Sequence, residues 1–262
     1  RLSWKLSSQQ RNTQQTAWQI LVASSKEKLD KNEGDIWNSG KINSSQSIQV
    51  PYAGKALNSK GQYYWKIKSF TNKGESSWSD AAHWSIGLLN KTDWKAKWIG
   101  YDEMDASKRI VPGIHAPGGN KDYKTRVSGD HILPVLRKSF TINKSVRRAT
   151  AFVSGVGHYE LHVNGAKVGD HFLAPGWTYY DKRVLYNTFD VTKQVANGGN
   201  AIGVMLGNGF YNVPNVRYRK LLTAFGNPAL IMKLLVEYID GSKTEIVSDN
   251  SWKTTKSPIT FS

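Results

Sequence analysis

Residues 154–192 limit what this chain can fold into more than any other stretch does. Tyr159, Leu161 and Val163 are apolar and alternate with polar residues, and this period of two predicts a strand with one buried face. Asn164-Gly165 follows directly and is typical of a two-residue hairpin turn, because both central residues need a positive φ. The apolar pattern then resumes, so we predict antiparallel β-structure in this part of the chain.

Further strands are expected on both sides of this hairpin. Residues 136–153 hold two strand-like segments, and residues 201–206 form a continuous apolar run that favours a strand buried on both faces. Residues 230–238 could form a helix or a strand, but the turn dipeptide Asp240-Gly241 favours a hairpin and therefore a strand. The pattern predicts a jelly-roll β-sandwich over residues 132–262.

The first 88 residues also show short strand-like segments separated by polar turns. The expected strands span residues 2–6, 17–23, 36–40, 47–52, 63–70 and 82–86. Short strands at this spacing are typical of an immunoglobulin or fibronectin type III sandwich, whose tryptophans are expected in the core. The fold class is therefore predicted to be all-β, with two β-sandwich domains in succession.

Residues 89–131 are expected to connect the two domains. Residues 94–99 alternate, which predicts an extended strand that pins the domains together. Residues 101–131 have no periodicity, hold several prolines and glycines, and are rich in Lys and Arg. So long an irregular loop is usually functional or disordered, and we favour disorder.

The composition narrows the class of protein. Without cysteine, the chain can form neither disulfides nor thiolate metal sites. It has no apolar run of the ~20 residues that cross a membrane. The net charge of +16 suggests a nucleic-acid partner, but the basic residues are spread along the chain and no recognition helix or RNA-binding motif is evident. Since the chain begins at Arg1 without an apolar leader, we expect that any signal peptide has been removed and that the chain belongs to a longer protein.

The sequence contains no motif for metal-dependent, nucleotide-dependent or serine-dependent catalysis. It lacks the metalloprotease, Walker A, EF-hand and nucleophile-elbow patterns. The glycine pairs at 155–157 and 207–209 lack the context of a dinucleotide site and are expected to allow close approach of two chain segments. A glycosidase needs two suitably spaced carboxyl groups, and no acidic residue stands in an apolar context that would raise its pKa. We therefore assign no catalytic residue.

Two loops rich in aromatic rings, residues 175–183 and 208–220, form the candidate binding surface. Aromatic faces stack on the apolar faces of sugars, and nearby carboxylate and guanidinium groups bind sugar hydroxyls. The candidate sugar-binding residues are Trp177, Tyr179, Tyr180, Asp181, Arg183, Asn208, Tyr211 and Arg217. In the alternative interpretation, Trp177 and Tyr180 close the end of the sandwich, Asp181 caps a turn, and Arg217 belongs to a solvated face.

Several short motifs follow one another along nearly the whole chain. They include Trp37-Asn38-Ser39-Gly40, Trp98-Ile99-Gly100, Pro175-Gly176-Trp177-Thr178 and Gly207-Asn208-Gly209-Phe210-Tyr211. In this order and spacing they resemble the N-terminal region of bacterial α-L-rhamnosidases, glycoside hydrolase family 78. The resemblance implies a fibronectin-like domain and a jelly-roll domain, followed in the whole enzyme by an (α/α)6 barrel with the catalytic carboxylates. It also implies a secreted or periplasmic parent, an inverting hydrolase that removes terminal rhamnose, with rhamnose-containing carbohydrate as partner.

Because that barrel is not in this sequence, we expect the chain itself to be catalytically inactive. Some jelly-roll domains of such enzymes resemble carbohydrate-binding module family 67, which binds L-rhamnose through calcium with an Asp-Asn pair. Here the corresponding pair is Asp181-Lys182, and Tyr218 stands in place of a further Asn ligand, so calcium is disfavoured and no cofactor is expected. Three hypotheses remain: a non-catalytic region of a rhamnosidase, an independent lectin-like module and, from charge alone, a nucleic-acid binder.

Overall fold

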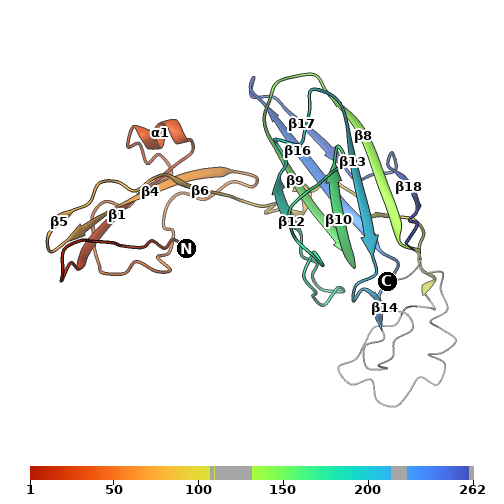
Figure 1. Ribbon diagram of the computed structural model, residues 1–262, viewed down its shortest axis with the longest axis horizontal. Coiled ribbons are helices and arrows are strands. Elements are labelled where there is room, and N and C mark those ends of the chain that lie inside the picture. The colour runs from red at the N-terminus through yellow and green to blue at the C-terminus, as the bar shows by residue number, and fades with distance from the viewer. Residues whose placement is uncertain (107–108, 110–131, 214–222, 260–262) are drawn as a thin grey trace, which may run out of the picture. The chain divides into compact units, whose positions relative to one another are not determined.

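The computed structural model describes residues 1–106, 109, 132–213 and 223–259. The all-β prediction is confirmed, because strands predominate in the described residues and the α-helix among them, α1 (Lys26–Asp30), has five residues. The chain forms two compact units, Arg1–Asp93 and Trp94–Ser262, each with its own strands (Figure 1). This division lies after the predicted boundary at residue 88, and the described part of the predicted connector from Trp94 onward belongs to the second unit.

The first unit is built on one antiparallel sheet. Its strands are β1 (Gln15–Ala23), β2 (Trp37–Asn38), β3 (Ile42–Asn43), β4 (Gln62–Thr71), β5 (Gly74–Glu75) and β6 (Ala82–Ser85). The long strands β1 and β4 pair with each other, placing Ile20 opposite Ile67. The short strands β2 and β3 pair with β1, whereas β5 and β6 pair with β4. Two central strands thus carry the inward-facing side chains of this unit.

The core of the first unit is rich in aromatic rings, as its tryptophan content predicts. The buried residues are Leu2, Trp18, Ile20, Val22, Val50, Tyr63 and Ile67, with Trp4, Trp37, Trp65 and Trp84 packed against them. Two expected strands are wrong, because residues 2–6 and 47–52 form only an isolated bridge between Leu2 and Val50. The φ of +60° at Gln49 interrupts the extended backbone beside that bridge.

Apolar periodicity does not reveal the helix α1, since a single turn is too short to show a period. Its signal lies instead at its start, where the side chain of Ser25 accepts a hydrogen bond from the backbone N–H of Lys28 at 3.3 Å. Leu29 is buried against the sheet, and Lys26 and Asp30 form an ion pair of 2.7 Å one turn apart. The N-cap residue Ser25 is therefore the clearest sequence signal for this helix.

Asp35 ties the segment after α1 back to the end of β1. Its carboxylate accepts hydrogen bonds from Lys28 Nζ at 2.7 Å and from both the backbone N–H and the hydroxyl of Ser24. Burial raises the pKa of Asp35, but these hydrogen bonds outweigh it and hold the pKa at about 2, below the ordinary value of 3.8. Because the folded pKa is lowered, the stability that Asp35 contributes is present above the ordinary pKa and is lost as the pH falls toward the folded value.

Asp35→Asn should therefore lower the thermal midpoint of the first unit at neutral pH and have little effect near pH 2. Thermal unfolding of the variant and the wild type, followed by circular dichroism at several pH values, measures this difference. A gap between the two midpoints that stays constant down to the lowest pH would show that the ionised carboxylate contributes nothing.

The second unit contains two large sheets and a small one. Its strands are β7 (Ile99–Gly100), β8 (Pro134–Ile142), β9 (Val146–Val156), β10 (His158–Val163), β11 (Ala166–Lys167), β12 (Asn187–Asp190), β13 (Gly198–Gly207), β14 (Asn212–Val213), β15 (Thr223–Ala224), β16 (Ala229–Tyr238), β17 (Lys243–Val247) and β18 (Lys253–Lys256). One large sheet has the order β11-β10-β13-β8-β18, and the other has β12-β9-β16-β17 with β7 paired to β16. β14 and β15 pair with each other. The more specific jelly-roll topology stays a prediction.

Both predicted hairpin turns of this unit are confirmed. Asn164 and Gly165 have φ values of 52° and 82° and connect β10 to β11. Gly241, with φ of 82°, lies in the turn between β16 and β17, so residues 230–238 form a strand and not a helix. Asn and Gly tolerate the left-handed backbone that such turns need, and these are the residues with positive φ in the two turns.

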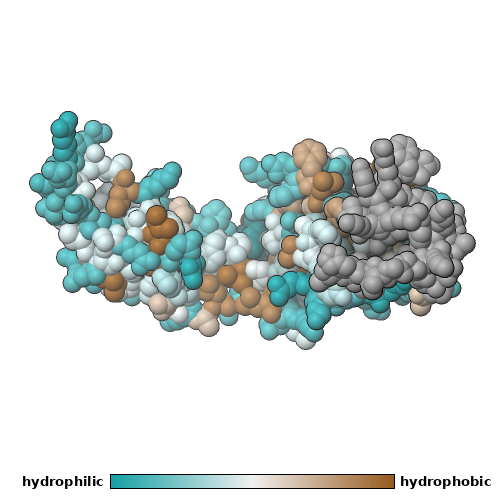
Figure 2. Space-filling view, turned by 90° about the horizontal axis from the view of Figure 1, so that it is seen from below, coloured by the Kyte–Doolittle hydropathy of each residue, from teal (hydrophilic) through white to brown (hydrophobic). Residues whose placement is uncertain are grey.

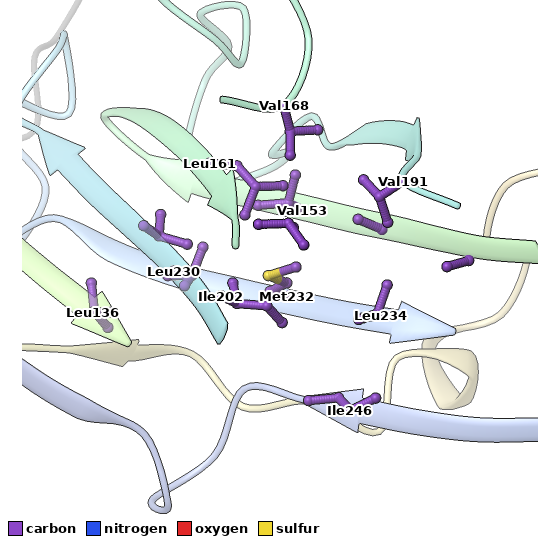
Figure 3. Close-up of a cluster of buried hydrophobic side chains, with 14 of the residues drawn as sticks. Leu136, Val153, Leu161, Val168, Val191, Ile202, Leu230, Met232, Leu234 and Ile246 are labelled. Atoms are coloured by element: carbon purple, nitrogen blue, oxygen red, sulfur yellow. The ribbon is translucent and has the colours of Figure 1, made fainter. Parts of the chain in front are cut away.

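The main core lies between the two large sheets. Figure 3 shows side chains from both sheets gathered in one cluster, among them Leu161 of β10, Ile202 of β13 and Met232 of β16. The expectation that residues 201–206 are buried on both faces is wrong. In β13, Ile202, Val204 and Leu206 are buried, but the residues between them are partly exposed. The run looks uniformly apolar because Ala201, Gly203 and Met205, none of them polar, occupy its outer face.

β16 is buried on both faces along most of its length, as is its neighbour β9. The core-facing residues of β16 alternate with Lys233 and Leu235, which are also buried. On this second face the Nζ of Lys233 lies 2.6 Å from Oε1 of Glu245. Phe152 of β9 packs against Tyr186, and Tyr186 contacts Trp94 with ring centroids 5.2 Å apart. Side chains thus cover the outer face of this sheet as well as the inner one.

On the face that Figure 2 presents, brown residues lie in small groups among teal and white ones on each unit. Scattered apolar residues of this kind are ordinary on a soluble surface. Within the described ranges, no helix is long and apolar enough to cross a membrane.

Candidate functional site

The two aromatic loops predicted from the sequence belong to the second unit. The first loop lies between β11 and β12, and the second follows β13 and leads into β14, which Figure 1 shows at one end of this unit. Gly157, at the start of β10, brings the chain close to the second loop. Gly157 has a φ of +99°, and a Cβ atom at this position would lie 2.2 Å from the carbonyl oxygen of Gly207, too close for any other residue. The expectation that the glycine pairs allow close approach is confirmed.

Rings from both loops meet in an aromatic cluster, which we define as Tyr179, Tyr180, Tyr211 and Phe225. Tyr180 lies edge-on to Tyr211 and to Phe225, with centroid separations of 5.1 and 5.4 Å. Tyr211 stacks on Phe225 at 5.9 Å, and Tyr179 approaches Phe225 edge-on at 6.4 Å. Edge-on and offset contacts of this kind stabilise aromatic pairs. The cluster therefore joins the two loops to β15 and its neighbouring turn.

Burial within this cluster changes the acidity of two hydroxyl groups. It raises the pKa of Tyr180, to which the neighbouring Tyr211 adds, and it raises the pKa of Tyr211 against the opposing effect of Arg109. Both phenols thus stay protonated at neutral pH and can donate hydrogen bonds.

Trp177 lies outside the cluster and is 60% exposed. Its ring stacks on Phe210 with a centroid separation of 4.7 Å and an interplanar angle of 21°. A ring that is covered on one face and still largely exposed presents its other face to solvent. The structure therefore separates the two rings that the alternative interpretation grouped together: Tyr180 packs inside the cluster, whereas Trp177 forms an open platform.

The polar candidates have different surroundings. Asp181 forms an ion pair with Arg109, which comes from a part of the chain that the sequence analysis had not assigned to the site. Arg183 is exposed beside it. Asn208 is 3% exposed, and its carbonyl oxygen accepts hydrogen bonds from the backbone N–H groups of Tyr211 and Asn212. Asn208 thus shapes the second loop from within. Arg217 and Tyr218 lie outside the described residues.

A pocket of about 500 Å³ borders the aromatic cluster, and we call it the end pocket. Arg109, Tyr211 and Phe225 line it together with β7, with Trp98, Asp102 and Glu103 on either side of β7, and with Asn227 in the turn before β16. Asn227 Nδ2 donates a hydrogen bond of 2.8 Å to Asp102 Oδ1, which holds an amide and a carboxylate together in the wall. Rings combined with a few convergent polar groups are the usual lining of a small-ligand site.

The described residues contain no group of three or more His, Cys, Asp or Glu side chains that could hold a metal ion. The one carboxylate predicted near a calcium position, Asp181, has a guanidinium as its partner. Calcium prefers six to eight oxygen ligands, and this surrounding does not fit one. That no calcium binds here stays a prediction.

Two family models match the chain. Residues 1–90 match the domain described as "Rha78A-like, N-terminal immunoglobulin domain", and residues 144–262 match "Alpha-L-rhamnosidase N-terminal domain". The two units thus correspond, in order, to two all-β domains of one class of glycoside hydrolase. The chain thus corresponds to the N-terminal domains of the α-L-rhamnosidases of glycoside hydrolase family 78.

Individual α-L-rhamnosidases match nearly the whole of this chain in sequence and in fold. The chain is 37% identical over 266 residues to an α-L-rhamnosidase of Formosa agariphila, covering 99% of this chain and 28% of that protein. The structure of an α-L-rhamnosidase from Dictyoglumus thermophilum is 40% identical, with a TM-score of 0.80, and the match covers 28% of that chain. A Streptomyces avermitilis α-L-rhamnosidase complexed with L-rhamnose shares the fold, with a TM-score of 0.82 at 22% identity over 39% of its length.

The chain therefore spans less than two fifths of the length of each of these relatives. Its described residues form two units dominated by β-strands, and the barrel portion of the family is not among them.

Proposed function

We propose that the chain serves a secreted or periplasmic α-L-rhamnosidase as a non-catalytic N-terminal region that supports the catalytic barrel. We also propose that the end of its second unit binds rhamnose-containing carbohydrate weakly. Neither nucleic acid nor a membrane is a partner in this proposal. The observation that carries the sugar-binding part is the open ring of Trp177, which stacks on Phe210, the residue that precedes Tyr211 of the end pocket.

The chemistry of this end suits a neutral sugar. A pyranose has one face of C–H groups that can stack on an indole, and its hydroxyl groups need both donors and acceptors. The end pocket offers the Asp102 carboxylate as acceptor and the Tyr211 hydroxyl as donor within one wall. Because Asp102 is already held by Asn227, little side-chain ordering is left for the ligand to impose.

The proposed affinity is low. One stacked ring contributes ~1–3 kcal/mol on the scale known for bases on aromatic side chains. Together with a few hydrogen bonds this supports a dissociation constant in the millimolar range, about −4 kcal/mol. Such a site would raise the local concentration of a chain-like substrate and would not hold a single sugar for long.

Glu160 and Asp249 of the second unit do not suit the role of a general acid in glycoside hydrolysis. A general acid in such an enzyme needs a raised pKa. Where partners move a carboxyl pKa in the second unit they lower it: hydrogen bonds from Lys167 and His162 do so at Glu160, and hydrogen bonds from Ser251 do so at Asp249. These groups are paired anions and not proton donors.

We expect the purified chain to release no product from an aryl α-L-rhamnoside, because the barrel portion of the family is not among its described residues. A chromogenic assay over a range of protein concentrations measures this. Turnover that scales with the concentration of the chain, and survives repeated purification, would contradict the proposed non-catalytic role. A preparation of a full-length relative is the positive control.

A further inference from the structure

The first unit has a pocket of its own, for which the sequence suggested no chemistry. Its volume is about 450 Å³, within the range of small-ligand sites. The walls are Tyr52, Trp65 and Trp84, with Leu57 and Ile86 between them. Tyr52 and Trp84 meet edge-on with centroids 6.3 Å apart, so these two rings support each other in the wall.

The two tryptophans that line this pocket have indole N–H groups without an acceptor among the described residues. Trp4 Nε1 donates to Gln15 Oε1 at 3.0 Å, and Trp252 Nε1 donates to the carbonyl oxygen of Val247 at 2.8 Å. Trp65 and Trp84 have no such acceptor among the described residues, and neither indole nitrogen is sealed from solvent. Both side chains are only partly exposed. Two residues of the pocket wall thus carry an indole N–H group that no described residue accepts.

The polar residues around the pocket are Arg1, Ser3 and His83. Ser3 Oγ accepts a hydrogen bond from the backbone N–H of Gln49 at 2.9 Å, so its own proton remains available for donation. No carboxylate is among the described lining residues and Arg1 brings a positive charge, so a cationic ligand is disfavoured. The lining offers ring faces and hydrogen-bond donors, and it therefore suits a ligand with an apolar face and several oxygen acceptors.

We propose that this pocket binds a single neutral pyranose ring of a glycan, as a second sugar site separate from the one on the second unit. The C–H face of the ring packs on Trp84 or Tyr52, and ring and hydroxyl oxygens accept from the indole N–H groups. Two weak sites on one chain would bind a glycan more tightly than either alone when both are reached together. The choice of ligand class rests on the proposed function, but the site itself rests on the pocket and its unpaired donors.

Indole N–H signals in a ¹H–¹⁵N correlation spectrum report on this pocket directly. We expect the signals of Trp65 and Trp84 to shift in a saturable manner when methyl α-L-rhamnoside or methyl β-D-glucoside is added at millimolar concentrations. Trp84→Phe keeps an aromatic ring and removes one donor, and it should weaken the binding seen at Trp65 about tenfold. His83→Ala, at an exposed position, serves as a variant that tests the rim without disturbing the core.

The outcomes separate this inference from the proposed function. Trp177→Ala should leave the responses of Trp65 and Trp84 unchanged, because Trp177 belongs to the other unit. If both glycosides move the Trp177 signal but not those of Trp65 and Trp84, the second site is wrong and the proposed function stands. If Trp65 and Trp84 respond and Trp177 does not, the second sugar site stands and the sugar site at Trp177 is wrong. An unchanged affinity in folded Trp84→Phe would overturn the role of its N–H group.

Discussion

Replacing Glu245 with alanine should destabilise the second unit by about 3–5 kcal/mol. The reason is the ammonium group of Lys233, which is fully buried and lies 2.6 Å from the Glu245 carboxylate. Lys95 Nζ lies 3.3 Å from the other carboxylate oxygen. Because the Lys95 side chain is mostly exposed, water can replace this ion pair in the variant at little cost in stability. Burial raises the pKa of Glu245, and the hydrogen bond and charge of Lys233 outweigh it and keep the pKa low. The variant would leave a buried cation without its carboxylate.

Urea unfolding followed by tryptophan fluorescence gives the free energy of unfolding for this test. A double variant, Lys233→Met with Glu245→Leu, is the matched control, because it removes the buried charge together with its partner. It should recover most of the lost stability, since apolar pairs often replace buried ion pairs at little cost. A double variant as unstable as Glu245→Ala would show that the packing of these side chains, and not their charge, is what matters.

Phe152→Ala should also cost about 3–5 kcal/mol, because the change would leave a cavity in a tightly packed layer. Phe152 is completely buried on the outer face of β9, beside Tyr186. The prediction tests the packing on the outer face of this sheet, where Phe152 and Tyr186 lie, and not the main core between the sheets. The same urea experiment measures the loss.

Phe172→Ala is the matched control for this second prediction. Phe172 is 84% exposed in the loop after β11, where Lys167 Nζ lies 4.8 Å from the ring centroid. Its removal should change the free energy of unfolding by less than about 1 kcal/mol, the scale of an exposed cation–π contact. Equal losses for Phe152→Ala and Phe172→Ala would contradict the existence of a second buried layer.

The β-structure could be predicted wherever the signal was local. Asn164-Gly165 and Asp240-Gly241 mark their turns by residue type, and the strands they join follow. The burial of β13 and β16 could not be predicted, because both are apolar runs in the sequence and differ only in what covers their outer faces. That covering comes from elsewhere in the chain, as with Tyr186 and Trp94 over Phe152.

The candidate site shows the same limit. The rings of the two loops were identified from composition and neighbouring polar residues, but their separate roles depend on exposure, which no pattern records. Asn208 was expected at a binding surface and is buried instead. The end pocket was missed, because Asp102 and Asn227 are far apart in sequence and meet only in the folded unit. The only sequence signal for this region was the motif that contains Trp98.

The central claim, that the exposed ring of Trp177 marks a sugar-binding end, is tested most directly by titrating L-rhamnose into ¹⁵N-labelled protein. We expect saturable shifts in the backbone signals of residues 175–183 and 208–213. Trp177→Ala should abolish these shifts while leaving the thermal midpoint nearly unchanged, and Phe172→Ala should preserve them. If Trp177→Ala unfolds the second unit, or responds to L-rhamnose as the wild type does, the ring is part of the core or irrelevant to binding, and the claim is contradicted.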